Sequence, residues 1–236
     1  MIVISLGGSI VAPDDVDVDL VVGFRSVLDE YIREADERAI VVVGGGAPAR
    51  RYQTAYRAVS DRDDARSDRG AGADAQDWIG VMATRLNAEL LRHSFAPLCL
   101  DPVVYDPTGP IDFTGSVLVA AGWKPGFSTD YDAVVLAERF DADTIINLSN
   151  ISRVYTADPA AHPEATPLER VGWEEFHAIV GTTWAPGSNL PFDPIATKRA
   201  REQGLRVIAA GGRDLDNTRA ILRDDAFVGT TIGPAE

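Results

Sequence analysis

Hydrophobic residues along this chain form short continuous runs, and several runs are followed by glycines and then by a helical pattern. The runs at residues 2–6 and 39–43 predict strands buried on both faces, because a half-exposed strand would alternate apolar and polar residues. Helical periodicity follows them at residues 19–37 and 48–59. The repeated order of strand, glycines and helix predicts a parallel sheet covered by helices.

The rest of the chain continues in the same way. Further strands are expected at residues 97–100, 117–121, 144–148, 206–210 and 227–232, and further helices at residues 75–93, 131–140, 173–180, 195–203 and 217–222. The expected connections are an exposed loop at residues 60–74, a hairpin at residues 103–113 and a long loop at residues 184–194. We therefore predict one α/β domain over residues 1–236, a three-layer αβα sandwich with a mainly parallel central sheet and two lobes that meet near residue 140.

Two expected helices carry apolar stripes that predict their buried faces. In the helix at residues 19–37 the stripe consists of Val22, Val27, Leu28, Tyr31 and Ile32. In the helix at residues 75–93 it consists of Ile79, Met82, Ala83, Leu86 and Leu90. Asp77, Gly80 and Thr84 share a narrower face of that second helix, where the small glycine leaves room for another group to approach.

Residues 121–130, Ala-Gly-Trp-Lys-Pro-Gly-Phe-Ser-Thr-Asp, join an expected strand to an expected helix. Gly122, Pro125 and Gly126 fit a loop, and Ser128, Thr129 and Asp130 fit a helix start, where a side-chain oxygen caps free N–H groups. Lys124 adds a positive charge, and only one other lysine, Lys198, occurs in the chain. The segment predicts a cradle for an anion, which we interpret as a nucleotide phosphate.

Glycines also follow the first two strands, at residues 7–9 and 44–46. In open α/β sheets, ligands bind where the carboxyl ends of strands meet the amino ends of helices. One glycine pair after a strand is most often only a tight turn. Three glycine-bearing loops, each after a buried strand, predict a shared site at one sheet edge where two phosphates can meet.

Composition narrows the class of protein. The net charge of −14 argues against a nucleic-acid partner, which would call for a basic face. No apolar run is long enough to span a membrane, and the amino terminus lacks the features of a signal peptide. The single cysteine, Cys99, excludes an internal disulfide, so we expect a cytoplasmic location. The Asp- and Arg-rich composition fits either a high-salt cytoplasm or a GC-rich genome, and the sequence does not separate the two.

Several familiar catalytic motifs are absent from the sequence. There is no Gly-x-x-x-x-Gly-Lys-Ser/Thr loop, and the glycines at residues 44–46 lack the dinucleotide-binding spacing. The three histidines lack the spacing of zinc ligands, so no protein-held metal site is expected. No Gly-x-Ser-x-Gly nucleophile elbow occurs.

The distinctive motifs follow one another in a characteristic order. They are Ser5-Leu6-Gly7-Gly8-Ser9; Val43-Gly44-Gly45-Gly46 with Ala49-Arg50; Asp77-Trp78-Ile79-Gly80 with Thr84-Arg85-Leu86-Asn87-Ala88; Gly126-Phe127-Ser128-Thr129-Asp130; and Val154-Tyr155-Thr156-Ala157-Asp158-Pro159. Together they cover nearly the whole chain and resemble the archaeal-type uridylate kinases of the amino acid kinase superfamily. The resemblance implies transfer of the ATP γ-phosphoryl group to UMP, a requirement for Mg²⁺ and a homohexamer built from dimers.

The resemblance also implies residue roles. On the UMP side these are Gly45, Asp77 at the ribose hydroxyls, Trp123, Lys124, Pro125, Gly126, Phe127, Ser128 and Thr129. On the ATP side these are Gly8, Ser9, Gly46, Arg50, Ser149, Tyr155 and Asp158. Arg50 and Lys124 would be the catalytic cations, residues 1–140 the acceptor lobe and residues 141–236 the ATP lobe.

The chain departs from the family pattern at three places. Ser5 stands where many superfamily members carry a lysine, Arg153 replaces the usual glycine before Val154, and residues 187–194 differ from the bacterial form. Two alternatives therefore stay open, a kinase of the same fold with another acceptor and a non-catalytic nucleotide-binding or oxyanion-storage protein. Asp193 could position a cation or cap the helix that follows, and Lys198 fits an ordinary helix-surface residue.

Overall fold

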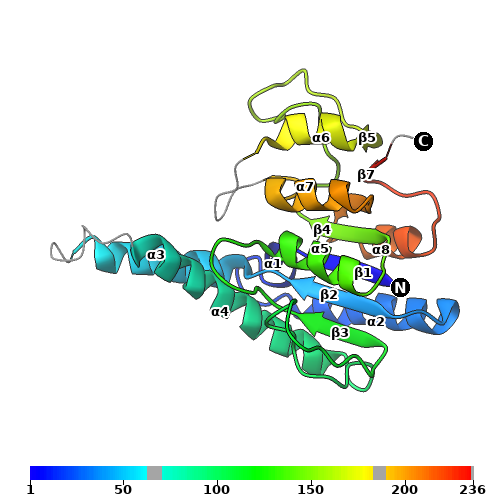
Figure 1. The fold of residues 1–236 in the computed structure, drawn as a ribbon, viewed down its shortest axis with the longest axis horizontal. Helices are drawn as coiled ribbons and strands as arrows, with labels where there is room; N and C mark the ends of the chain where they lie inside the picture. Colours follow the sequence, from blue (N-terminus) through cyan, green and yellow to red (C-terminus); the bar gives the residue numbers. More distant parts are fainter. Residues whose placement is uncertain (63–70, 183–189, 235–236) are drawn as a thin grey trace.

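A seven-stranded sheet organises the chain (Figure 1), and the computed structural model describes residues 1–62, 71–182 and 190–234. The strands are β1 (Ile2–Leu6), β2 (Ala39–Val43), β3 (Val117–Ala120), β4 (Thr144–Ser149), β5 (Arg170–Gly172), β6 (Arg206–Gly211) and β7 (Thr230–Gly233). They lie in the order β3-β2-β1-β4-β6-β7-β5, and every neighbouring pair is parallel except β6 and β7. The predicted, mainly parallel sheet is therefore confirmed.

Helices cover both faces of this sheet. They are α1 (Gly8–Val11), α2 (Val18–Ala35), α3 (Gly46–Ser60), α4 (Ala71–Ser94), α5 (Thr129–Arg139), α6 (Trp173–Val180), α7 (Pro194–Glu202) and α8 (Leu215–Leu222). Among the described residues, no helix is both long enough and apolar enough to cross a bilayer.

Alternating side chains of the strands enter two separate hydrophobic cores, because successive strand residues point to opposite faces. Ile4 and Leu6 of β1 pack in one core with residues of α2, α4 and α8. Val3 packs in the other core, with residues of α5, α6 and α7. Two cores on opposite faces of one sheet confirm the three-layer sandwich.

The register of the sheet brings the carboxyl ends of four strands to one edge. Leu6 at the end of β1 pairs with Val43 of β2 and with Leu148 of β4, while Val42 pairs with Ala120 of β3. The segments that follow these strands therefore start side by side, as the sequence predicted for the glycine-bearing loops.

The prediction for the buried face of α4 was wrong. Met82 is 57% exposed and Leu86 is 68% exposed, whereas Val81, Ala88 and Leu91 are buried. The helix turns a polar strip toward the pocket side of the sheet, and its apolar stripe faces outward. In α2 the same kind of error affects Val22 alone, which is exposed while the other predicted stripe residues are at least half-buried.

The segment between α4 and β3 also differs from the prediction. Residues 97–100 form no strand, and the expected hairpin at residues 103–113 is absent from this described segment. Val104 instead makes a single parallel bridge to Ala120, and the Asp101 carboxylate accepts hydrogen bonds from the N–H groups of Thr114 and Gly115. A buried carboxylate organises this connection, which an apolar pattern could not reveal.

The other expected elements are confirmed within a few residues, and the short β5 and α1 were not anticipated. Helix α4 begins at residue 71, so the expected loop at residues 60–74 is shorter than predicted. Residues 63–70 of that loop and residues 183–189 of the expected loop at residues 184–194 lie outside the described residues.

Candidate functional site

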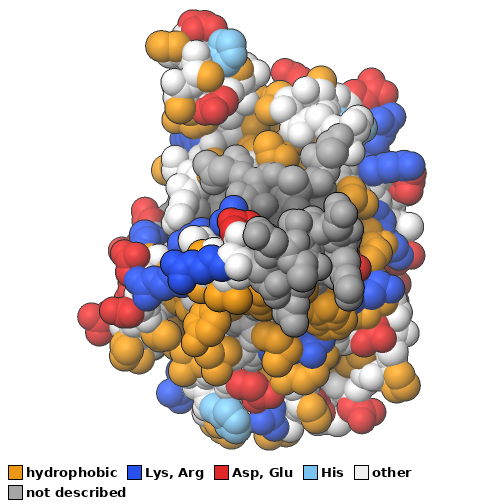
Figure 2. Space-filling view, turned by 90° about the vertical axis from the view of Figure 1, so that its left-hand side faces the viewer, with side chains coloured by type: hydrophobic (Ala, Val, Ile, Leu, Met, Phe, Trp, Pro, Cys, Tyr) orange, Lys and Arg blue, Asp and Glu red, His pale blue; other side chains and the backbone are white. Residues whose placement is uncertain are grey.

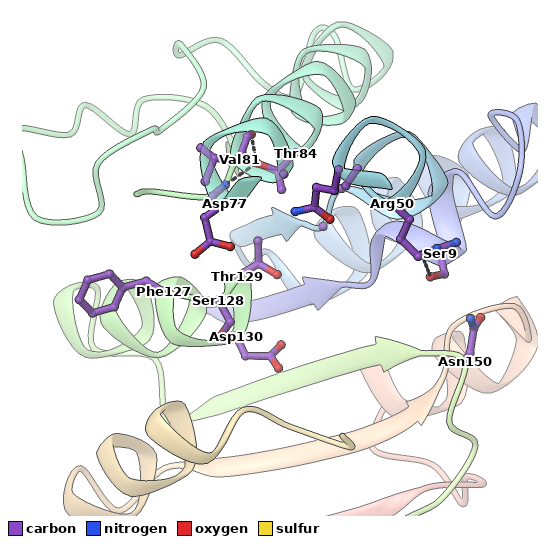
Figure 3. A pocket seen from close by; sticks show the side chains of 17 residues that line it. Ser9, Arg50, Asp77, Val81, Thr84, Phe127, Ser128, Thr129, Asp130 and Asn150 are labelled. Carbon is purple, nitrogen blue, oxygen red and sulfur yellow. Dashed lines mark hydrogen bonds between the residues drawn. The ribbon is translucent and has the colours of Figure 1, made fainter. Parts of the chain in front are cut away.

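A pocket of about 560 Å³ opens at the carboxyl edge of the sheet, between α3, α4 and the start of α5. Its lining comprises Ser9, Gly44, Gly45, Gly46, Ala49, Arg50, Gln53, Asp77, Gly80, Val81, Thr84, Gly122, Phe127, Ser128, Thr129, Asp130 and Asn150. In Figure 3, Phe127 and Asp77 lie toward one end, while Ser9 and Arg50 lie toward the other. All three predicted glycine-bearing loops contribute to this one pocket.

Two of these loops interlock through their backbones. A Cβ atom added at Gly8 would lie 2.1 Å from the Gly46 nitrogen and 2.5 Å from the Gly44 carbonyl carbon. Gly46 has φ of +64°, a conformation that other L-residues rarely adopt. Glycine is therefore required on both sides of this contact, which leaves backbone amides close to the pocket.

Arg50 supplies a guanidinium group at the Ser9 end of the pocket. One turn into α3, it donates from Nη1 to the Ser9 hydroxyl at 3.2 Å and from Nη2 to the Pro13 carbonyl at 3.2 Å. These contacts hold the positive charge beside the first glycine loop, where an anion could bind.

The loop at residues 122–128 is tied to α4 by side chains. The Gly122 N–H donates to the Thr84 hydroxyl at 2.8 Å, and the Gly126 N–H donates to Asp77 Oδ2 at 3.0 Å. Arg85 Nη2 donates to the Trp123 carbonyl at 3.2 Å. The predicted polar strip of Asp77 and Thr84 therefore holds this loop and also lines the pocket.

Three aromatic rings pack against one another, in tilted arrangements, along the same loop and the start of α5. The ring centroids of Trp123 and Phe127 are 4.9 Å apart, and those of Phe127 and Tyr131 are 4.7 Å apart. Lys124 Nζ lies 3.7 Å from the Trp123 centroid, and this exposed lysine is not part of the pocket lining. Leaving this cation–π contact would cost about 1 kcal/mol, which is small enough for the side chain to swing toward a bound phosphate.

Asp130 is a pocket carboxylate whose oxygens both accept hydrogen bonds. The Ser5 hydroxyl donates to Oδ1 at 2.8 Å, and the Asp193 N–H donates to Oδ2 at 3.2 Å. Desolvation raises the pKa of Asp130 from its ordinary value of 3.8 to about 6, and the nearby Asp193 charge adds to the rise. Ser5, one of the departures from the family pattern, therefore serves as a hydrogen-bond donor to this carboxylate.

Asp132 lies two residues after Asp130 in α5 and is fully buried. Its Oδ2 accepts the Trp123 N–H at 3.1 Å, while its Oδ1 has no hydrogen-bond partner in the described part of the chain. Burial raises the pKa of Asp132 to about 7, with a smaller contribution from the charge of Asp130. Through its hydrogen bond with Trp123, this acid holds the start of the loop in place. It was not among the predicted site residues.

Asp193 caps the amino terminus of α7, which was one of the two roles predicted for it. Its Oδ1 accepts from the N–H groups of Ile195 and Ala196 at 2.6 and 2.7 Å. Lys198 is exposed on the same helix, in agreement with a surface role.

The pocket brings together half of the predicted site residues. Those in its lining are Ser9, Gly45, Gly46, Arg50, Asp77, Phe127, Ser128 and Thr129. Those outside the lining are Gly8, Trp123, Lys124, Pro125, Gly126, Ser149, Tyr155 and Asp158. Gly8, Gly126 and Ser149 are nevertheless adjacent in sequence to the lining residues Ser9, Phe127 and Asn150.

The predicted ATP-side residues after β4 make mainly local contacts. The Ser149 hydroxyl accepts a hydrogen bond from the Ile151 N–H, and the Asp158 carboxylate accepts one from the Ala160 N–H. Tyr155 forms an isolated antiparallel β-bridge with Pro167. Arg153 Nη1 lies 3.5 Å from Glu169 Oε1, so the two side chains form an ion pair.

Gln53, Asn150 and Asp130 line the pocket but were absent from the predicted site residues. Gln53 fills the space that Gly80 leaves open, since a Cβ atom at Gly80 would lie 2.5 Å from Gln53 Nε2. The group that approaches the small residue of α4 is thus a side chain of α3. The helical spacing Ala49, Arg50, Gln53 could have indicated this pocket-facing position.

A sequence profile described as "Amino acid kinase family" matches residues 1–210. The chain belongs to the amino acid kinase family. It is 36% identical over 234 residues to a uridylate kinase from Methanospirillum hungatei, with 98% of this chain and 94% of that protein covered. It is 32% identical to a uridylate kinase from Haloquadratum walsbyi, with 100% and 94% covered.

Solved structures of the amino acid kinase family agree with the fold. Uridylate kinase from Archaeoglobus fulgidus superposes with a TM-score of 0.75 at 30% identity, covering 98% of this chain and 99% of that one. Aspartate kinase from Synechocystis superposes with a TM-score of 0.69 at 15% identity, covering 99% of this chain and 40% of that one, and supports the fold alone. The predicted resemblance to archaeal-type uridylate kinases is confirmed.

Proposed function

We propose that this protein is a UMP kinase, which transfers the γ-phosphoryl group of ATP to UMP and yields UDP and ADP. The observation that carries the proposal is the single pocket shared by three glycine-bearing loops, in a chain whose relatives across almost its full length are uridylate kinases. Such a pocket can hold a donor and an acceptor phosphate end to end.

The two ends of the pocket suggest the two subsites. At the ATP end, Ser9, Gly46 and Arg50 would contact the triphosphate, supported by Gly8. The segment after β4, with Ser149, Tyr155 and Asp158, would then follow the adenosine. At the UMP end, Asp77 would bind the ribose, Gly45 would approach the phosphate, and residues 123–129 would wrap the nucleotide. Residues 1–140 would then form the acceptor lobe and residues 141–236 the ATP lobe.

The chemistry asks little of a general base, because a UMP phosphate oxygen is already an anionic nucleophile. That oxygen forms a bond to the γ-phosphorus of ATP while the bond from this phosphorus to the β,γ-bridging oxygen breaks, leaving ADP with the electron pair. The protein's task is to hold both anions in line and to stabilise the charge of the transition state. Arg50, Lys124 and the backbone amides of the glycine loops would supply that stabilisation.

Mg²⁺ would accompany ATP as its usual counterion, held mainly by phosphate oxygens and water. Within the described residues, no group of three or more His, Cys, Asp or Glu side chains could hold a metal on its own. The carboxylate of Asp130 lines the pocket and offers the hard oxygen that Mg²⁺ prefers. Bound Mg²⁺ would neutralise phosphate charge.

We further propose a homo-oligomer assembled through the outer face of α3 and α4, as a dimer within the expected hexamer. Tyr52 and Trp78 are 71% and 44% exposed, and with Met82 and Leu86 they border a groove of about 360 Å³. Figure 2 shows hydrophobic side chains gathered on the side of the molecule toward which these helices project. A large exposed apolar face on a soluble enzyme commonly marks a subunit interface. We place the enzyme in the cytoplasm, in pyrimidine nucleotide synthesis.

The direct test is to incubate the protein with ATP, Mg²⁺ and each nucleoside monophosphate in turn and to separate the products. UDP and ADP in equal amounts, with UMP as the best acceptor, are the expected result. A different preferred acceptor would identify another kinase of this fold. Tight ATP binding with no diphosphate from any acceptor would identify a non-catalytic nucleotide-binding protein.

A further inference from the structure

Gln53 is a polar side chain of the pocket for which the reaction chemistry gives no role. It lies on α3 one turn after Arg50 and reaches across to α4, where it occupies the slot above Gly80. The residue is therefore on the wall that Asp77 also forms, rather than at the Ser9 end of the pocket.

Hydrogen bonding fixes the orientation of the Gln53 amide. Its Nε2 donates to the Gln76 carbonyl at 3.1 Å. A carbonyl can only accept, so the opposite orientation of the amide would place two acceptors together. Within residues 1–62, 71–182 and 190–234, nothing donates to Gln53 Oε1, which leaves this oxygen as an acceptor for a ligand.

Asp77, like Gln53, has one side-chain oxygen to which nothing in the described part of the chain donates a hydrogen bond. Its Oδ2 is occupied by the Gly126 N–H, and no group in the described part of the chain donates to its Oδ1. Because Gln53 is bonded to the backbone of Gln76, the residue next to Asp77, the two acceptors come from neighbouring points of α3 and α4. The wall therefore offers two acceptors where a ligand must supply donors.

Few parts of a nucleotide can meet that demand. A phosphate offers no donor at neutral pH, and a uracil ring offers one N–H between two acceptors. A ribose offers two adjacent hydroxyl donors, which match two neighbouring acceptors. We propose that Gln53, together with Asp77, receives the ribose diol of the acceptor, so that Gln53 is a specificity-determining residue for ribonucleotides over deoxyribonucleotides. This inference rests on the proposed UMP kinase activity.

The test compares UMP with 2′-deoxy-UMP and 3′-deoxy-UMP in the wild-type enzyme and in Gln53→Leu. Loss of one neutral hydrogen bond should lower kcat/KM for UMP by about tenfold. For the analogue that lacks the hydroxyl bound by Gln53, the substitution should cost nothing further. A purely structural role would instead lower kcat/KM for all three acceptors by the same factor, and that result, like an unchanged kcat/KM for UMP, would overturn the inference.

Two more variants separate specificity from packing. Gly80→Ala places a methyl group against Gln53 Nε2 and should displace the amide, so it should reproduce the loss of discrimination with Gln53 itself intact. Thr54→Ala, on the exposed side of α3, should leave all three acceptors unchanged. If the wild-type enzyme converts no UMP at all, the proposed function fails; if it converts UMP but neither Gln53→Leu nor Gly80→Ala alters discrimination, only the inference fails.

Discussion

The two sides of the pocket are built by different means. At the end proposed for ATP, the glycine loops after β1 and β2 touch through their backbones, and a single added methyl group at Gly8 would collide with main-chain atoms. At the end proposed for UMP, the loop at residues 122–128 is held by side chains of Asp77, Thr84 and Asp132. A backbone contact tolerates almost no substitution, whereas side-chain ties can be changed one at a time. A single substitution at the glycine contact should therefore abolish activity, whereas a single substitution among the side-chain contacts should lower activity only in part.

The sharpest test of this contrast is Gly8→Ala. Because Gly44 and Gly46 cannot yield without moving the strand ends, we expect a loss of more than about 3 kcal/mol of unfolding free energy and no measurable activity. Denaturant unfolding and the UMP assay measure these effects. Gly72→Ala is the matched control, since a methyl group there meets nothing within 4 Å, and it should be neutral or slightly stabilising. A folded, active Gly8→Ala enzyme would contradict the backbone account.

Arg50→Ala removes the cation at the end proposed for ATP while leaving the glycine contact in place. We expect kcat to fall by roughly 100- to 1000-fold, the usual effect of losing one group that stabilises transition-state charge. Steady-state kinetics with both substrates near saturation would measure it. Arg51→Ala removes a neighbouring exposed arginine that faces Asp14 and Asp15, and its activity should match the wild-type enzyme. Equal losses in the two variants would remove Arg50 from the mechanism.

Lys124→Ala tests the cation proposed for the UMP end of the pocket. We expect kcat/KM to fall about 100-fold if the ammonium group leaves the Trp123 ring to meet a phosphate during the reaction. The other lysine provides the control, and Lys198→Ala should have no effect on turnover. Near-normal kinetics for Lys124→Ala would limit this residue to stacking on the aromatic rings.

Asp77→Ala should act on one substrate only. Loss of the carboxylate would remove the proposed ribose contact and the hydrogen bond from the Gly126 N–H, so the KM for UMP should rise by about tenfold while the KM for ATP stays the same. Initial rates with each substrate varied in turn give both constants. A selective rise in the KM for ATP would mean that the two subsites are assigned the wrong way round.

Asp132→Asn should show the smallest effect and a characteristic pH dependence. The unfolded chain releases this proton near pH 4, whereas the folded protein holds it to about pH 7, so the wild-type acid makes folding less favourable as pH rises between these values. The variant should therefore gain stability relative to wild type as pH rises, by on the order of 1 kcal/mol at pH 8, because the unpaired buried amide offsets part of the benefit. Unfolding curves at pH 5 and pH 8 measure it. A constant difference between the two pH values would show that Asp132 does not titrate in this range.

The same contrast explains what the sequence could predict. The continuous apolar runs of β1, β2 and β4 and the glycines after them carry local signals, so the sheet, its edge and the meeting of the loops were predictable. The contact of Gln53 with Gln76 joins two helices, and the hydrogen bond of Asp132 with Trp123 joins a helix to a loop, so neither leaves a periodic pattern in the sequence. The exposed stripe of Met82 and Leu86 misled for a related reason. Apolar periodicity identifies an apolar face of a helix but does not say whether the chain's own core covers that face.

Helix α4, like α3, borders both the pocket and the outward groove. Asp77 and Thr84 line the pocket, while Met82 and Leu86 lie on the exposed outer face. A helix moves as a rigid unit. A small rotation of α4 that changed the contacts proposed for UMP would therefore also change the shape of the outward groove. The proposed binding of UMP in the pocket and the proposed association through the groove would then be coupled, and the apparent affinity for UMP should depend on protein concentration.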